Sequence, residues 1–283
     1  MPNPLPRRRF LAAALLTLGP ATACAQPDQD QPPTSTQPSS TAPLTSATST
    51  SAITEASISM PSPDTYAGEV PTSFDTHLPG IVETVPTVPG ERTIALTFDA
   101  CGGAYDAALI DTLREFEAPA TLFLAQPWID SHEDIARELA ADRLFQIENH
   151  GTRHVPLSVN GHAAYSIRGT ASPAETIEEI AGNAQRLADL GVRSTWFRSG
   201  TAHYDDVAVR IARDSGVRIA GFSVNGDRGA TASASEVASR IQHADDGAIV
   251  LAHMNHPHSG TAAGVRLALE QLRDSNIRFV ALQ

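Results

Sequence analysis

The stretch TIALTFDACGG, residues 93–103, runs from a series of β-branched and apolar residues into an aspartate and then into a small-residue loop. The apolar series predicts a buried strand. Asp99 ends this strand, where burial would raise its pKa unless a metal ion or an arginine held the carboxylate ionised. We therefore expect a functional position at the end of the strand, with the loop around Cys101, Gly102 and Gly103 as one wall of a site.

Apolar runs of strand length recur along the rest of the chain. With residues 93–98 they make seven predicted strands, the others being 120–125, 144–148, 195–197, 217–224, 248–252 and 277–281. Segments with helical periodicity lie between most of them, at 128–141, 173–190, 205–214 and 261–274. Ser172 with Glu175, and Ser233 with Glu236, have the spacing of capping boxes and predict two helix starts.

This alternation predicts parallel strands joined by crossover helices, and therefore an α/β fold. Seven strands in one domain favour a distorted barrel over an open sheet. We see no internal repeat in the sequence.

The first 64 residues are expected to lie outside the folded domain. Residues 1–25 have a basic start, a short apolar stretch and a small-residue cleavage site, as in a secretory signal, and the segment 7–11 (RRRFL) fits the twin-arginine export pattern. The segment 21–24 (ATAC) is similar to a bacterial lipobox, in which Cys24 would be lipidated, and simple cleavage after Ala23 or Ala25 is the alternative. Residues 26–64 are rich in Ser, Thr and Pro and predict a disordered linker, which leaves 65–283 as one domain.

Composition excludes several functions. The formal net charge of -12 and the lack of a basic cluster in the domain argue against a nucleic-acid partner. All 20 basic residues are arginine, which excludes Schiff-base and P-loop lysine chemistry. There are two cysteines. Because lipidation or cleavage would take Cys24 out of disulfide pairing, Cys101 is expected to be a lone thiol.

Polar residues gather where the predicted strands end. Asp99, His150, Arg198, Asp227 and His253 each stand at, or shortly after, the C-terminal end of a strand. In barrels and parallel sheets this edge is where sites are built.

Histidines point to a metal. His150 and His154 are four residues apart, a spacing at which two imidazoles can face one point and bind zinc. His253, His256 and His258 follow another apolar strand. Solvated or hydrogen-bonded loop histidines are the alternative explanation.

These residues together resemble a polysaccharide deacetylase of the NodB-homology family, carbohydrate esterase family 4. TFDACGG is similar to the family's TFDDG, HGTRH to its HSxxH or HTxxH, and FRSGTAHYD to its RPPYG, while GFSVNGD and IVLAHM are similar to its last two motifs. The motifs occur in order over nearly all of residues 92–283.

The resemblance implies a distorted (β/α)7 barrel and metal-assisted hydrolysis of N-acetyl groups, with zinc as the expected metal. Asp99 matches the catalytic base and Arg198 the residue that orients it. His253 matches the general acid and Asp227 the carboxylate that tunes it. His150 and His154 match metal ligands, and the backbone N–H of Thr201 is expected to bind the oxyanion, in a loop where Ser-Gly-Thr replaces Pro-Pro-Tyr.

One motif departs from the family. Ala100 replaces the second aspartate, which is the third metal ligand. Cys101, His256 or an additional water could take its place, and we favour His256 because it follows His253 at the same rim.

The sequence thus predicts an exported monomeric deacetylase that acts on an extracellular N-acetylated glycan, most simply peptidoglycan, and that meets a membrane only through a lipid anchor. A glycan-binding domain without activity, and a hydrolase of O-acetyl esters or small amides, are the alternatives. Trp128, Tyr165 and Tyr204 are candidates for stacking on sugars.

Overall fold

The computed structural model describes residues 60–282. The predicted export signal, Cys24 and the predicted linker as far as residue 59 lie outside the described residues. Met60 packs against a hydrophobic cluster of the domain, and Ser62 caps a short 3-10 helix, η1 (Pro63–Tyr66). The described fold therefore includes the last residues of the range predicted as linker. Within it, none of the helices combines the length and the apolar character that crossing a membrane requires.

The domain is built on one nine-stranded sheet in which all paired strands are parallel. Its order is β11-β12-β3-β4-β5-β8-β10-β2, and β13 pairs with the first half of β3. The strands are β2 (Ile81–Val82), β3 (Arg92–Ala100), β4 (Ala120–Leu124), β5 (Phe145–Asn149), β8 (Trp196–Phe197), β10 (Arg218–Ala220), β11 (Val224–Asn225), β12 (Ala248–His253) and β13 (Ile277–Val280).

The sheet curls into an incompletely closed barrel. The segment around β2 spans the gap between β10 and β12, because Ile81 aligns with Ile219 of β10 while Thr84 bridges Ala248 at the start of β12. This bridge lies at the N-terminal end of β12, and the other end of the barrel is left open. The predicted α/β distorted barrel is confirmed.

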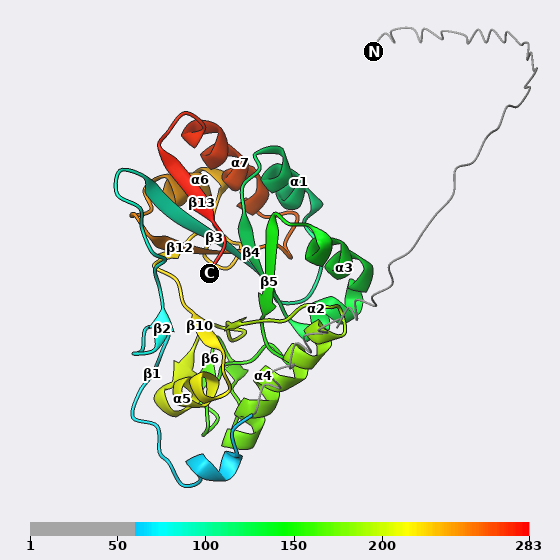
Figure 1. Cartoon of the computed structure of the whole chain (residues 1–283), viewed down its shortest axis with the longest axis vertical. Coiled ribbons are helices and arrows are strands. Elements are labelled where there is room, and N and C mark those ends of the chain that lie inside the picture. The colour runs from blue at the N-terminus through cyan, green and yellow to red at the C-terminus, as the bar shows by residue number, and fades with distance from the viewer. Residues whose placement is uncertain (1–59, 283) are drawn as a thin grey trace, which may run out of the picture. The chain divides into compact units, whose positions relative to one another are not determined.

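Helices cover the outside of the sheet (Figure 1). They are α1 (Ala107–Glu115), α2 (Gln126–Ser131), α3 (Glu133–Ala141), α4 (Pro173–Ala188), α5 (Asp206–Asp214), α6 (Ala234–Gln242) and α7 (Thr261–Leu272). Two small antiparallel pairs complete the fold, β1 (Phe74–Asp75) with β9 (Tyr204–Asp205), and β6 (Ala163–Ala164) with β7 (Ile167–Arg168).

Side chains of β3 alternate between two cores, as the pleat of a strand requires. Leu96, Phe98 and Ala100 pack in the outer cluster with α1, α6 and α7. Ala95 belongs to an inner cluster with residues of β4, β8, β10 and β12. Asp99 lies on the same side of β3 as Ala95, because the two residues are an even number of positions apart. Its carboxylate therefore lies at the open end of the barrel interior.

The helix starts follow the sequence signals. The side chain of Ser172 accepts a hydrogen bond from the Glu175 backbone N–H, and Ser233 with Glu236 forms the complete predicted capping box. The box at Ser172 is only half formed, because Glu175 accepts from the N–H of Ala171 instead.

Two predicted elements need correction, and one helix was missed. The predicted helix 128–141 is two helices, divided at His132, whose ring stacks on Trp128 with centroids 4.8 Å apart. The predicted strand 217–224 is two strands, β10 and β11, because the carbonyls of Ala220 and Gly221 turn to accept hydrogen bonds from Arg198. Helix α1 was not predicted, although Asp106 caps it.

Candidate active site

A cavity of about 630 Å³ lies at the C-terminal ends of the strands. Its lining comes from the C-terminal parts of β3, β11 and β12, from the loops that follow β1, β3, β5, β8, β10 and β11, and from the β6–β7 hairpin: Thr76, Asp99, Cys101, His154, Tyr165, Ile167, Gly200, Thr201, Ala202, Phe222, Asn225, Arg228, Gly229, Leu251 and His253. Of the three aromatic residues predicted for stacking, Trp128 and Tyr204 are buried and only Tyr165, 77% exposed, reaches the cavity.

The base predicted at the end of β3 is paired with the predicted arginine. Arg198 donates from Nη1 to Oδ1 of Asp99 over 2.8 Å, and both side chains are buried. Burial by itself would raise the pKa of Asp99, but the positive charges of Arg198, His150 and His253 hold it below its ordinary value. The carboxylate is therefore ionised in the folded protein.

The arginine is fixed by groups that the sequence did not reveal. Its guanidinium also donates to Thr97 Oγ1 at 2.9 Å and to the carbonyls of Ala220 and Gly221 at 3.1 and 2.9 Å. Its Cζ atom lies 4.3 Å from the centre of the Phe123 ring. With so many partners the fully buried cation has one orientation, and it presents Nη1 to Asp99.

Three potential metal ligands meet beside this pair. Within the described residues, Cys101, His150 and His154 form the one group of this kind, with ligand atoms that all lie within 4.8 Å of one another. His150 is oriented by its Nδ1, 2.9 Å from the carbonyl of Arg198, so its Nε2 faces Cys101 Sγ at 3.6 Å and Asp99 Oδ2 at 3.6 Å. Burial would raise the pKa of the Cys101 thiol, but interactions with the neighbouring imidazoles, chiefly that of His150, lower it well below its ordinary value.

The spacing of one pair of these ligands suits a metal such as zinc. Zinc holds sulfur at about 2.3 Å and nitrogen at about 2.0 Å, so two ligands at a tetrahedral angle are about 3.5 Å apart, close to the 3.6 Å between Cys101 Sγ and His150 Nε2. His154 Nε2 is buried without a hydrogen-bond partner among residues 60–282, as expected of a nitrogen that serves as a ligand.

His256, the replacement that we favoured for the missing aspartate, lies elsewhere. It is exposed and is not part of the group, and its ring contacts that of His253 at a centroid distance of 6.3 Å. Ala100 faces the outer core, whereas Cys101 follows it on the inside and lines the cavity. The structure therefore favours Cys101 over His256 as the third ligand.

The loop that carries His154 is anchored by helix α4. The buried carboxylate of Glu179 accepts hydrogen bonds from the N–H of Arg153 at 2.9 and 3.1 Å and from its Nε at 3.2 Å. Asn183 donates to Asn149 Oδ1 at 2.9 Å. Glu179 and Asn183 occupy core-facing positions of α4. Polar residues at such positions are a pattern that could have identified them from the sequence as functional residues.

The loop after β8 passes against the same segment. A Cβ atom on Gly200 would lie 2.3 Å from the carbonyl carbon of His154, so a side chain there would displace the histidine. This contact requires a residue without a side chain at this position of the loop. Thr201 lines the cavity, and its N–H makes no hydrogen bond within residues 60–282, so it is free to bind an oxyanion.

The predicted acid and its carboxylate are also brought together. His253 aligns with Asp99 across the β12–β3 ladder, and its Nδ1 lies 2.9 Å from Asp227 Oδ1. Asp227 is held in turn by the His253 N–H at 2.7 Å and by Thr261 Oγ1 at 2.9 Å. Burial would lower the pKa of His253, but hydrogen bonds with Asp227 and Cys101 and the nearby negative charges raise it well above its ordinary value.

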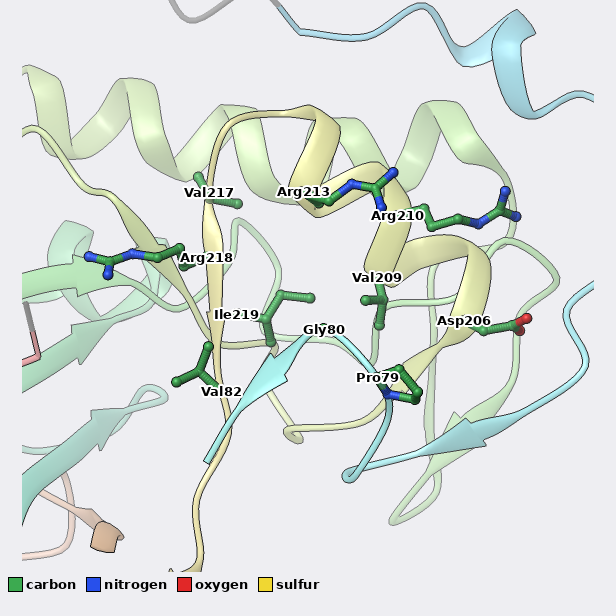
Figure 2. A pocket seen from close by; sticks show the side chains of 10 residues that line it. All are labelled: Pro79, Gly80, Val82, Asp206, Val209, Arg210, Arg213, Val217, Arg218 and Ile219. Carbon is green, nitrogen blue, oxygen red and sulfur yellow. The ribbon is translucent and has the colours of Figure 1, made fainter. Parts of the chain in front are cut away.

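A second cavity, of about 180 Å³, lies between the β2 segment, β10 and α5 (Figure 2). Its three arginines have partners elsewhere: Arg210 pairs with Glu69, Arg213 with Asp214, and Arg218 lies over the ring of Trp196. In Figure 2 the arginine side chains do not converge on one point. This cavity lacks the acid and base groups of the larger one.

Comparison with known proteins supports the resemblance. Residues 87–220 match the family model described as polysaccharide deacetylase. Among solved structures, the Bc1960 peptidoglycan N-acetylglucosamine deacetylase is 20% identical, covers 72% of this chain and 91% of its own, and superposes with a TM-score of 0.60. No curated protein shows significant sequence similarity to the chain.

Two further structures share the fold. PdaA of Bacillus subtilis, a family 4 carbohydrate esterase, is 18% identical over 71% of this chain and 82% of its own, with a TM-score of 0.57. BA3943 of Bacillus anthracis, described as a CE4 family pseudoenzyme, is 20% identical over 69% of this chain and 65% of its own, with a TM-score of 0.56. The domain thus has the (β/α) barrel fold of these structures.

Proposed function

We propose that the protein is an exported metal-dependent hydrolase that removes N-acetyl groups from an extracellular glycan. The observation that carries the proposal is that Asp99, paired with Arg198, and His253, paired with Asp227, line the same cavity as Cys101 and His154 of the Cys/His/His group. A base, an acid and a set of metal ligands are the groups that hydrolysis of an amide requires.

Asp99 acts as the base through its second oxygen. Oδ1 is already occupied by Arg198 Nη1, and Oδ2 is left beside His150 Nε2. Oδ2 accepts a proton from the attacking water as the water oxygen bonds to the acetyl carbon. The carboxylate is suited to this because its pKa is held low, so it is ionised before the water arrives.

His253 acts as the acid through Nε2. Its Nδ1 is bound by Asp227, and the raised pKa of the imidazole keeps it protonated. As the carbon–nitrogen bond breaks, Nε2 gives its proton to the departing amine, which leaves acetate and a free amino sugar. The N–H of Thr201 stabilises the negative charge that develops on the acetyl oxygen.

Zinc bound by His150, His154 and Cys101 would polarise the acetyl carbonyl and acidify the water, which is the chemistry that the protein's own groups lack. Cys101 supplies the negative charge that an aspartate would otherwise bring, since its thiol has a lowered pKa.

Peptidoglycan is the proposed substrate. The support for export is the N-terminal sequence, in which a basic start and a short apolar stretch precede the segment ATAC at 21–24. A protein held at the outer face of the membrane would meet cell-wall glycan first. The likeness to a structure described as a peptidoglycan N-acetylglucosamine deacetylase agrees with this choice.

Acetate release from N-acetylated and O-acetylated peptidoglycan fragments tests the function. The protein is stripped with a chelator and then reloaded with zinc. We expect release from the N-acetylated substrate only after reloading, and none with Asp99→Asn. Release from the O-acetylated fragment alone would favour an esterase. No release from either, by a folded and zinc-loaded protein, would favour a glycan-binding domain without activity, as the likeness to a pseudoenzyme also allows.

A further inference from the structure

The cavity has an exposed aromatic residue and an exposed cation on separate loops. Tyr165 comes from the β6–β7 hairpin, and Arg228 comes from the loop after β11. We propose that these two residues form a subsite for a sugar that carries a carboxylate next to the N-acetylated position. This inference rests on the proposed function and specifies which glycan the site selects.

Tyr165 is held in an unfavourable backbone conformation. It has φ of 50° and Ser166 has φ of 64°, and these two residues are the whole turn between the paired Ala164 and Ile167. Such a two-residue turn favours asparagine and glycine, so Tyr and Ser carry a conformational cost. The turn nevertheless places a tyrosine at its tip, 77% exposed.

The ring of Tyr165 is supported on one side. It meets the His203 ring edge to face, with centroids 5.3 Å apart, and Phe74 lies behind His203 at 5.5 Å. A supported aromatic ring at the rim of a cavity presents an apolar surface to a ligand. The axial C–H groups of a pyranose ring form a matching apolar face.

Arg228 supplies a charge without a partner. It is exposed, has φ of 55°, and its guanidinium forms no ion pair or hydrogen bond with any of residues 60–282. Its backbone is fixed by a hydrogen bond from its N–H to Asn225 Oδ1 at 2.8 Å. The backbone of the loop is therefore held in place, while the Arg228 guanidinium is free to bind a ligand.

Three acids at or near the cavity have other partners. Asp99 is paired with Arg198, and Asp227 with His253. Glu236 on α6 accepts hydrogen bonds from Ser233 in the capping box, and these are the main cause of its lowered pKa. The charge of Arg228 lowers this pKa further without a direct contact. On a chain of net charge -12, an unpaired cation at the cavity favours an anionic ligand group, and a guanidinium binds a carboxylate in a fork.

The test compares acetate release from two soluble tetrasaccharides. One alternates N-acetylglucosamine with N-acetylmuramic acid, whose lactyl group carries a carboxylate, and the other has the same sugars with that carboxylate converted to its amide. We expect the protein to prefer the acidic form in kcat/KM by about 5- to 10-fold, the effect of a charge-assisted hydrogen bond at an exposed site. Arg228→Gln should abolish this preference.

Arg143→Gln is the matched control, because Arg143 is an exposed arginine at the other end of the barrel, before β5, and its loss changes the net charge equally. It should retain the preference. Tyr165→Ala should lower kcat/KM for both substrates alike, because it removes the ring on which the sugar stacks. Tyr165→Phe keeps the ring and should have kcat/KM values like those of the native protein.

Calorimetric binding of the same two glycans separates this inference from the proposed function. If the folded protein releases no acetate, the deacetylase proposal fails, but a carboxylate-dependent dissociation constant that Arg228→Gln removes still supports the subsite. An equal preference in the native protein and in Arg228→Gln, whether in turnover or in binding, overturns it. So does binding that is insensitive to Tyr165→Ala.

Discussion

Asp99 and Arg198, 99 residues apart in the sequence, form an ion pair of 2.8 Å in which the guanidinium is completely buried. A buried arginine of this kind needs its counter-charge, since an uncompensated charge in the interior costs several kcal/mol. The pair therefore links stability to catalysis at the end of β3.

Asp99→Asn is the first test of that link. Turnover should fall about 100- to 10,000-fold, the usual contribution of a positioned base. The free energy of unfolding in urea should fall by about 3–5 kcal/mol, because Arg198 loses its partner. Zinc affinity should change little, since all three ligands are kept. Undiminished turnover in the folded variant would refute the base assignment.

Asp227→Asn should change the pH dependence of catalysis. The carboxylate helps to raise the pKa of His253, which must be protonated to act as an acid. Native activity should therefore persist above the pH at which an ordinary histidine loses its proton. Without the negative charge the pKa falls, so the alkaline limb of the kcat/KM profile should move to lower pH. A limb that stays in place would show that another group is the acid.

The metal ligands can be identified by zinc titration calorimetry of the full chain. Cys101→Ser and His154→Ala should each weaken zinc binding by more than the roughly 10- to 100-fold that loss of an outer hydrogen-bond partner costs. His256→Ala should bind zinc as the native protein does, because His256 is exposed and outside the group.

Cobalt gives a second measurement of the same site. The cobalt-loaded native protein should show a sulfur-to-metal charge-transfer band that Cys101→Ser lacks. Loss of zinc binding in His256→Ala, with the band absent from the native protein, would return the ligand role to His256.

Glu179→Gln tests the anchoring of the histidine loop. The carboxylate accepts the Arg153 N–H with both oxygens, and an amide nitrogen cannot accept it. Zinc binding should weaken about 10- to 100-fold. Glu175→Gln is the control, because Glu175 contacts the same arginine from an exposed position one turn earlier, at 3.4 Å. Equal effects of the two variants would mean that only the ion pair matters.

The sequence predicted the barrel and most of the site because its polar residues interrupt apolar strands. Asp99, His150, Arg198 and His253 are each visible as a charge or an imidazole after a hydrophobic run. The cap at Asp106 and the apolar positions of α1 were visible too, and that helix could have been predicted.

The ligand set was harder to predict because closeness in sequence is a poor guide within a loop. His256 follows His253 by three residues but turns to the surface. Cys101, by contrast, keeps the alternation of β3 and shares the inner side with Asp99. The carbonyls that hold Arg198 carry no side-chain signal at all, so no reading of residue types could have revealed them.

The pairing of β3 has a consequence for biosynthesis. The strand that carries Asp99 is flanked by β4 and, from much later in the chain, by β12 and β13. A ribosome must therefore add residues 248–253 and 277–280 before this strand has all its neighbours. Contacts of such sequence separation form slowly. Asp99 therefore remains without its proposed partner in catalysis until the ribosome has added His253, and a nascent chain that ends before that residue lacks the proposed acid.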